Sequence, residues 1–239
     1  MRRNVQTFGW TLIWGGIFLF GFLGWQLLGT DVLNAQAQAQ AQAALADTFE
    51  QARLEPPEVE QVSTADLLDS DSPTPANTVP EVVEWVKEPE PEPGEAFGVM
   101  RIPKIGLEAV IFSGVDLPTL KKGPGHMPWT PLPGQPGNSV IAGHRTTYGR
   151  PFFDIDLLEP GDIIEVETSI GVHVYEVRET IIVKPTDIWV TNPRPGAWLT
   201  LSACNPKFSA RERIIVFAEL VSGPNFEYAE LQKAQIGAS

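Results

Sequence analysis

From Phe97 onward the chain consists of short apolar runs separated by glycine and proline, and this pattern restricts the fold more than any other feature. Runs of this length are ordinary for strands but short for helices. They cover residues 99–102, 107–111, 139–142, 163–167, 172–183, 198–203 and 214–221. Strands at such spacing predict a mainly β domain, either a small antiparallel barrel or a sandwich. Helical signals are minor here, with one turn expected at 116–121 and two turns at 151–158.

The acidic residues are concentrated in one segment of the chain. The net charge at pH 7 is −13, and residues 46–95 carry 14 acidic residues against two basic ones. The part that follows, residues 96–239, is nearly balanced in charge. No basic stripe with interleaved aromatic residues follows Glu95, so nucleic acid is not expected as a partner.

Residues 8–29 form a largely apolar stretch that is long enough to span a bilayer. Two arginines precede the stretch, and no basic residue follows it until Arg53. The positive-inside rule therefore predicts a cytoplasmic N-terminus at 1–7, a transmembrane signal anchor at 8–29, and a remainder outside the cell. A cleaved signal peptide is the alternative, because small residues follow the stretch, but its apolar segment is typically only about 7 to 15 residues long.

Between the apolar stretch and the β domain, composition predicts two kinds of spacer. Residues 30–54 are rich in alanine and glutamine, and we expect a juxtamembrane helix there. Residues 55–95 form an acidic, proline-rich linker that cannot bury enough apolar surface to fold by itself. The linker would hold the β domain at 96–222 away from the membrane. Residues 223–239 are expected to form a C-terminal tail.

Cys204 is the only cysteine of the chain, and it ends a run that we expect to be a strand. Because side chains alternate along a strand, Cys204 shares a face with Thr200 and Ser202, opposite an apolar face. The following Asn205 and Pro206 should end the strand, which places the thiol at a rim that a substrate can reach. Outside the cytoplasm most cysteines pair, and a lone one cannot form an intramolecular disulfide. Cys204 is therefore a candidate nucleophile, with an inert small apolar residue as the alternative.

Two further candidates lie at the edges of expected strands. His144 ends a strand-like run, where an imidazole can transfer protons. Arg213 opens the last apolar run on its non-apolar face, and its guanidinium could donate to a developing oxyanion. Arg211 would share that face and is the alternative bearer of this role, while a surface ion pair is the simplest interpretation of an isolated arginine. Together with Cys204, these residues suggest cysteine acyl transfer.

The other two histidines fit structural roles. His126 lies in a Gly-Pro-Gly-His turn, and His173 alternates with apolar residues along an expected strand. Three histidines and one cysteine, none paired at ligand spacing, do not form a zinc-site pattern. We therefore expect neither a metal ion nor another cofactor.

The residues around the three candidates resemble those of the sortase family. The segment 200–204, Thr-Leu-Ser-Ala-Cys, is similar to the family's Thr-Leu-x-Thr-Cys signature, and His144 and Arg213 stand at the positions of its histidine and arginine. Segments 141–149 and 204–213 resemble class E sortases most, with class D second. The resemblance covers the expected β domain. It implies a closed antiparallel eight-stranded β-barrel with short helices, preceded by one transmembrane helix.

The resemblance also implies an activity. A sortase of this kind is a membrane-anchored cysteine transpeptidase that cleaves a C-terminal LPxTG- or LAxTG-like sorting signal between Thr and Gly. Cys204 would form a thioester, Arg213 would hold the peptide and stabilise the oxyanion, and His144 would exchange protons with the leaving and incoming amines. The acceptor amine would belong to a cell-wall precursor or a pilin lysine. Ala203 departs from the family's usual threonine, so we expect a hydroxyl near the substrate to be missing and activity or specificity to change.

Two other functions remain alternatives. An extracellular β-domain scaffold or adhesin would carry the thiol incidentally, and alkylation of Cys204 would leave its binding intact. The cysteine L,D-transpeptidases of the cell wall also use a β domain, but their Ser-His-Gly-Cys segment is absent from this sequence. Incubation with cell-wall peptide stems in place of protein signals would separate these enzymes from a sortase.

Overall fold

The centre of the protein is a closed barrel of eight strands, seen in a computed structural model that describes residues 2–24, 30–55, 59–63 and 82–238. The barrel strands are β3 (Ala96–Ile102), β4 (Leu107–Ser113), β5 (Gly125–His126), β6 (Gly137–Ala142), β7 (Ile163–Thr168), β8 (Gly171–Val183), β9 (Ala197–Asn205) and β10 (Glu212–Ser222). Their order around the barrel is β10-β8-β7-β3-β4-β5-β6-β9. The predicted mainly β architecture is confirmed, and the barrel rather than the sandwich is correct.

The barrel is not wholly antiparallel, which corrects the expected topology. β4 pairs with β5 in parallel, and so does β6 with β9, whereas the other neighbouring pairs are antiparallel. Parallel neighbours need a crossover connection rather than a tight turn. The connection from β4 to β5 contains helix α4 (Leu117–Lys122), and the connection from β6 to β9 contains strands β7 and β8. Short apolar runs in a sequence carry no information about such crossovers.

The barrel interior is filled by alternate side chains of its strands. On β9, Leu199, Leu201 and Ala203 are at most 2% exposed and belong to the main core cluster. On β10, Ile214 and Val216 belong to the same cluster. Complete burial of one such large aliphatic side chain stabilises the fold by roughly 1.5–3 kcal/mol. The predicted alternation on these two strands is confirmed, so Cys204 and Arg213 lie on the face that points away from the core.

The short helices at the barrel ends follow local sequence signals only in part. Helix α4 begins after Asp116, whose side-chain Oδ1 accepts a hydrogen bond from the backbone N–H of Thr119 at 3.1 Å. The expected two helical turns at 151–158 form turns and a short 3-10 helix instead. The 3-10 helices among the described residues are η2 (Pro103–Ile105), η3 (Ile155–Leu157) and η4 (Ile188–Thr191).

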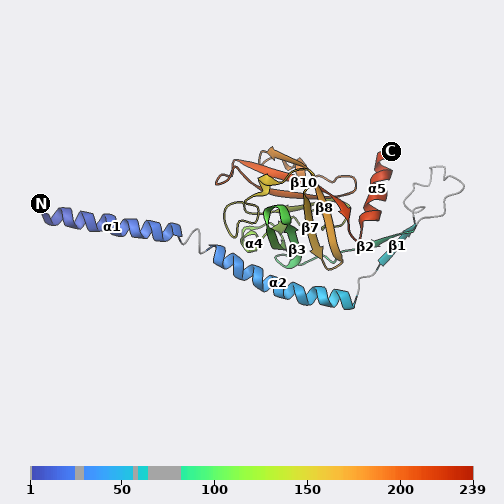
Figure 1. Cartoon of the computed structure of the whole chain (residues 1–239), viewed down its shortest axis with the longest axis horizontal. Helices are drawn as coiled ribbons and strands as arrows, with labels where there is room; N and C mark the ends of the chain where they lie inside the picture. The colour runs from blue at the N-terminus through green and yellow to red at the C-terminus, as the bar shows by residue number, and fades with distance from the viewer. Residues whose placement is uncertain (1, 25–29, 56–58, 64–81, 239) are drawn as a thin grey trace.

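Two long helices precede the barrel, α1 (Arg2–Gly24) and α2 (Thr30–Leu54). Figure 1 shows α1 pointing away from the barrel and α2 running alongside it. Among the described residues, no helix combines the length and the hydropathy that a membrane span requires. The expected transmembrane segment at 8–29 extends beyond α1, and its residues 25–29 lie outside the described part of the chain.

Helix α2 docks on the barrel, whereas composition suggested a spacer. Leu45 is 3% exposed and packs in a cluster with Val110 and Phe112 of β4. The Gln38 side chain forms the hydrogen bonds that a neighbouring strand would form with β4. Its Oε1 accepts from the Val110 backbone N–H at 2.7 Å, and its Nε2 donates to the Val110 carbonyl at 3.2 Å. Asn34 donates to two carbonyl groups at the end of α4. Short alanine side chains permit this approach, and the amides satisfy backbone groups on an open strand edge.

Part of the acidic linker is also ordered. Residues Val59–Ser63 and Val82–Val86 form the antiparallel strands β1 and β2. Val86 exchanges two hydrogen bonds with the side chain of Asn225, at 2.9 and 2.8 Å. Composition averaged over the whole linker does not reveal these valine-rich segments. Residues 56–58 and 64–81, which belong to the same linker, lie outside the described residues.

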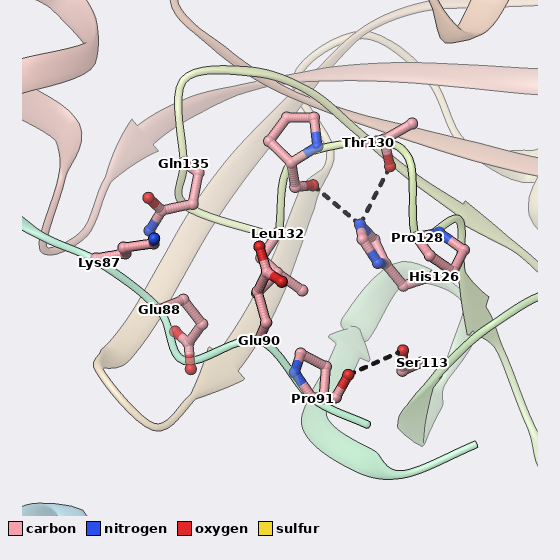
Figure 2. A pocket seen from close by; sticks show the side chains of 11 residues that line it. Lys87, Glu88, Glu90, Pro91, Ser113, His126, Pro128, Thr130, Leu132 and Gln135 are labelled. Atoms are coloured by element: carbon pink, nitrogen blue, oxygen red, sulfur yellow. Dashed lines mark hydrogen bonds between the residues drawn. The ribbon is translucent and has the colours of Figure 1, made fainter. Parts of the chain in front are cut away.

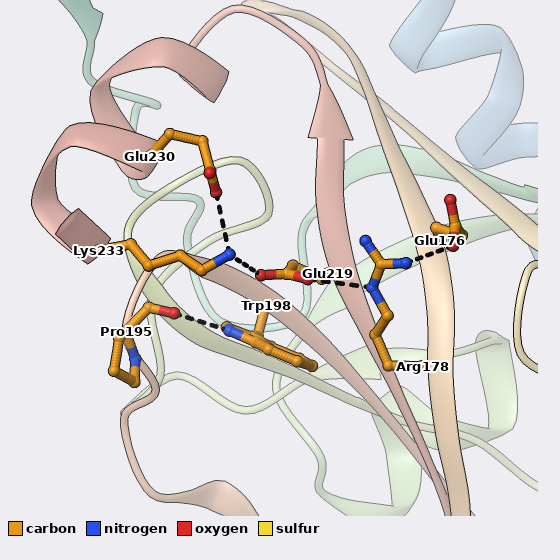
Figure 3. Close-up of polar contacts among 7 residues, drawn as sticks. All are labelled: Glu176, Arg178, Pro195, Trp198, Glu219, Glu230 and Lys233. Atoms are coloured by element: carbon orange, nitrogen blue, oxygen red, sulfur yellow. Dashed lines mark hydrogen bonds and ion pairs between the residues drawn. The ribbon is translucent and has the colours of Figure 1, made fainter. Parts of the chain in front are cut away.

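The residues expected to form a C-terminal tail contain helix α5 (Phe226–Ala238), which packs on the barrel. Ala229 of this helix is 1% exposed and lies in the main core cluster. Lys233 pairs with Glu219 of β10, and the same carboxylate accepts from Arg178 of β8 at 3.0 Å (Figure 3). The helix therefore extends the core at the barrel side formed by β8, β9 and β10.

Candidate active site

Cys204 and Arg213 are cross-strand neighbours. In the antiparallel pair of β9 and β10, Arg213 is the register partner of Cys204. Side chains of directly opposed residues in such a pair project from the same face of the sheet. Both side chains are half-buried, on the outward face at the end of β9 and the beginning of β10. The thiol and the guanidinium predicted from the sequence are thus brought together.

His144 lies at the same end of the barrel. The last register pair of the parallel strands β6 and β9 joins Ala142 to Ser202, and the next backbone bond runs from the Gly143 N–H to the Ser202 carbonyl at 3.0 Å. His144 and Cys204 each follow two residues after that pair. Neighbouring strands are about 4.8 Å apart, and side chains two residues apart share a face. The strand pairing therefore places His144 and Cys204 at the same end of two neighbouring strands, with Arg213 on the opposite neighbour of β9.

The imidazole of His144 sits in a partly closed environment. Among the described residues, its Nε2 is buried without a hydrogen-bond partner. The ring of Tyr148 lies 5.1 Å from it, centroid to centroid. Burial lowers the pKa of His144, and the positive charge of Lys121 lowers it further. A neutral imidazole with one free ring nitrogen can accept or deliver a proton at that atom.

The loop that carries His144 is held from two sides. Gly143 packs against Phe152 so closely that a Cβ at this position would lie 2.6 Å from the ring. Phe152 also donates its backbone N–H to the His144 carbonyl at 3.2 Å. On the other side, Asp31 of α2 accepts from the Gly149 N–H at 3.0 Å and pairs with Arg150 at 3.4 Å. Helix α2 therefore contacts the loop that carries His144, at Gly149 and Arg150, which follow the histidine in the chain.

Arg213 and Arg211 differ in position. The Nη1 of Arg213 donates to the carbonyl groups of Ala210 and Glu212, at 3.2 and 2.9 Å, which holds the guanidinium at the barrel rim. Arg211 is exposed and precedes β10, so it has no register partner on β9. The geometry favours Arg213 over Arg211 for contact with a peptide bound at Cys204.

Ala203 does not face the side on which Cys204 lies. Its side chain is 2% exposed and belongs to the barrel core. A threonine at this position would therefore place its hydroxyl toward the core if β9 stayed regular. The sequence predicts that Ala203 leaves a hydroxyl missing next to the substrate. The orientation of the side chain contradicts this, because strand alternation directs position 203 into the core.

His126 and His173 lie elsewhere in the barrel. His126 is 2% exposed, and its Nε2 lies 2.9 Å from the Pro131 carbonyl oxygen. His173 is fully buried, its Nε2 lies 3.2 Å from Thr168 Oγ1, and burial lowers its pKa to about 4. In the part of the chain that the structure describes, no group of three or more His, Cys, Asp or Glu side chains could hold a metal ion.

A cavity of about 260 Å³ is separate from the candidate catalytic residues. The end of the linker forms one wall through Glu88, and the other is formed by His126 of β5 and by Gln135 in the segment after it (Figure 2). None of the three candidate residues lines it. The cavity marks the junction of linker and barrel and contributes nothing to the candidate site.

Sequence reasoning missed Arg145, the residue after His144. It is 3% exposed, its Nη2 pairs with Asp156 at 2.9 Å, and its Nη1 donates to Asn205 Oδ1 at 2.6 Å. An arginine in a polar loop carries no local signal of burial, because its partners lie far along the chain.

Comparison with known proteins agrees with this geometry. The family model of the Sortase domain matches residues 100–221. Sortase SrtE1 of Streptomyces coelicolor is 35% identical over 146 residues, which cover 54% of this chain and 42% of the relative. Sortase D of Bacillus subtilis is 36% identical over 137 residues, covering 55% and 67%. The chain thus matches less than half the length of the first relative.

Solved structures give the same result. Sortase E from Streptomyces avermitilis is 36% identical, with a TM-score of 0.51 over 56% of this chain and 93% of that one. Sortase E1 from Streptomyces coelicolor, solved with a tripeptide in its active site, is 34% identical, with a TM-score of 0.53 over 54% and 90%. The barrel, the matched domain and these similarities together show that the chain belongs to the sortase family.

Proposed function

We propose that this protein is a cysteine transpeptidase that cleaves a C-terminal sorting signal of LPxTG or LAxTG type between Thr and Gly and passes the acyl group to an amine. The observation that supports the proposal most is that Arg213 is the register partner of Cys204, while His144 follows the end of the neighbouring strand β6. Family membership supports the same chemistry, since sortases act through a cysteine. The incidental thiol of an adhesin would not require a guanidinium as its register partner.

In the first half-reaction, the Cys204 sulfur, as the thiolate and with His144 protonated, attacks the threonine carbonyl carbon of the bound signal. Negative charge then develops on the carbonyl oxygen, and Arg213 is placed to donate hydrogen bonds to it. His144 gives a proton to the departing glycine nitrogen, so the C–N bond breaks while the S–C bond remains. The product of this step is a thioester on Cys204.

In the second half-reaction, an amine attacks the thioester. His144 accepts a proton from that amine, the S–C bond breaks, and the sulfur leaves as the thiolate. Burial and the charge of Lys121 lower the pKa of His144, so the protonated imidazole needed to expel the first amine is the minor form at neutral pH. The proposed acceptor is an amine of a cell-wall precursor or a pilin lysine.

Residues 8–29 would anchor the protein in the cell membrane, with the barrel on the outer side. Several large apolar side chains of α1 are exposed, among them Trp14 at 63%, Phe18 at 77% and Phe20 at 75%. A contiguous apolar surface of this kind marks a membrane or protein contact. Fractionation of cells that express the full chain tests this, since replacing Phe18 and Phe20 by Ser should release the protein from the membrane fraction.

A peptide-cleavage assay tests the enzymatic proposal. Full-length protein is incubated with fluorogenic peptides that contain LPxTG, LAxTG or a scrambled sequence, with and without an added amine. We expect cleavage of a signal peptide and a ligated product when amine is present. Cys204→Ala should abolish both, whereas Ser202→Ala, a change on the same face of β9, should retain them. Equal turnover by the Cys204 variant would exclude the mechanism.

A further inference from the structure

Arg145 is a buried cation whose hydrogen-bonding groups are directed at the protein itself. Its Nη1 donates to Asn205 Oδ1 at 2.6 Å and to the Cys204 carbonyl at 3.4 Å, and its Nε donates to the Phe153 carbonyl at 3.4 Å. Its Nη2 pairs with Asp156 Oδ1 at 2.9 Å. A buried guanidinium is tolerated only where such partners compensate for lost hydration. Arg145 therefore joins the loop after β6, the end of β9 and the turn at 153–156.

Asn205 extends this set of contacts to β10. While its Oδ1 accepts from Arg145, its Nδ2 donates to Glu212 Oε2 at 3.0 Å. Glu212 is also the register partner of Asn205 across β9 and β10. The side chains thus form a continuous network, Arg145 to Asn205 to Glu212. Each member stands next in sequence to one of the candidate catalytic residues, namely His144, Cys204 and Arg213.

We propose that Arg145, Asn205 and Glu212 are positioning residues that hold the thiol, the imidazole and the guanidinium in one arrangement. The inference rests on the proposed transpeptidase function, which uses those three groups. Amide geometry makes the network directional, since one end of the Asn205 side chain must accept and the other must donate. A shift at Asn205 would move both the end of β9 and the beginning of β10.

Arg145 is not a second oxyanion donor. It is 3% exposed, and its three guanidinium nitrogens all contact protein atoms. Asp156 is a stable partner for it: burial would raise the pKa of this carboxyl, but the guanidinium of Arg145 and then Lys207 hold it below its ordinary value. Lys207, in the loop after β9, also pairs with Asp154 at 2.9 Å. The turn at 154–156 is thereby tied, through Arg145 and Lys207, to the segment at 204–207.

Asn205→Asp tests the network with little change in shape. Aspartate still accepts from Arg145 but cannot donate to Glu212, whose carboxylate it would then face. We expect kcat for signal-peptide cleavage to fall about 10- to 100-fold, because small displacements at a reacting centre are costly. KM should stay within about twofold of the wild-type value, since the network is assigned to positioning the reacting groups and not to binding the peptide. A kcat unchanged in this variant would overturn the proposal.

The double variant Asn205→Asp/Glu212→Gln restores the missing donor. The glutamine amide can donate to the new carboxylate, so the bond is rebuilt in the opposite direction. We expect kcat to recover to within about threefold of the wild-type value, a non-additivity expected only of residues in contact. A double variant as slow as Asn205→Asp would contradict the network.

Arg145→Lys removes the planar fork while keeping the charge, and a lysine cannot reach the same set of acceptors. We expect a similar fall in kcat and a change of at least about threefold in the rate of iodoacetamide alkylation of Cys204. Alkylation needs no turnover, so it reads the site even if no signal peptide is cleaved and the proposed function fails. The matched control is Arg178→Lys, another arginine between two carboxylates but on the outside of β8 (Figure 3).

The control separates positioning from general stabilisation. Arg178→Lys should leave kcat and alkylation within about twofold of wild type. If both lysine variants lowered kcat only in proportion to their loss of thermal stability, and alkylation did not change, Arg145 would be a stabilising residue alone and the proposal would be wrong.

Discussion

Arg213 lies directly opposite Cys204 on neighbouring antiparallel strands, so the sole cysteine of the chain shares a sheet face with a guanidinium. The pairing results from two strands that meet only when the barrel closes, β9 with β10. His144 is added from the other side by the parallel strand β6. Three residues from separate parts of the chain are thereby found at one end of three neighbouring strands.

Arg213→Lys should lower kcat/KM by at least about 100-fold, equivalent to about 2.7 kcal/mol of transition-state stabilisation. Lysine retains the charge but loses the guanidinium donors that hold both the backbone and the developing oxyanion. Arg211→Lys is the matched control two residues away, and it should retain activity within about twofold. Steady-state kinetics with a signal peptide measure both. Equal losses of kcat/KM in the two variants would show that stabilisation of the oxyanion is not specific to Arg213.

Lys121→Gln should shift the pH dependence of cleavage. The charge of Lys121 is a cause, after burial, of the lowered pKa of His144, so removing it must raise that pKa toward its ordinary value. The rate step that needs protonated His144 is lost as pH rises through this pKa. The alkaline limb of the plot of cleavage rate against pH, which reports the titration of His144, should therefore move to higher pH.

The control for this shift is Lys122→Gln. Lys122 donates to the Gly94 carbonyl at 3.2 Å and is not a cause of the His144 shift. Its pH profile should coincide with that of the wild type. Movement of the limb to lower pH in Lys121→Gln, or no movement at all, would show that this charge does not act on the reacting imidazole.

Leu45→Ala should destabilise the docked helix α2 by about 2 kcal/mol or more, because it removes a buried side chain from the cluster with β4. Leu54→Ala on the same helix is the control, since Leu54 is 74% exposed and its truncation should change stability by less than about 0.5 kcal/mol. Hydrogen exchange of the α2 amides measures the difference. Similar protection in the two variants would mean that α2 does not depend on this contact.

The strands of the barrel could be predicted because their signal is local. Runs such as 163–167 and 214–221 alternate or persist over the length of one strand, and they correspond to β7 and β10. Strand β5 consists of Gly125 and His126 alone, too short to produce a pattern. The parallel pairs were missed for a different reason, since crossovers depend on which strands become neighbours after folding.

The site was predictable where alternation and chain position were enough. Cys204 lies outward because Leu201 and Ala203 fill the core, and this followed from periodicity. The burial of Arg145 did not, because Asn205 and Asp156 compensate for it only in the folded protein. The docking of α2 was hidden as well, since amide groups supply part of its contacts and the apolar part centres on Leu45 within an alanine- and glutamine-rich segment.

The most direct measurement is the intact mass of the protein during reaction with a signal peptide. The account predicts an adduct whose mass equals the acyl fragment up to threonine, attached to Cys204 and removed by an added amine. Ser202→Ala should form the same adduct, and Cys204→Ala should form none. Cleavage of the peptide without any adduct, or cleavage by Cys204→Ala at the wild-type rate, would contradict the account.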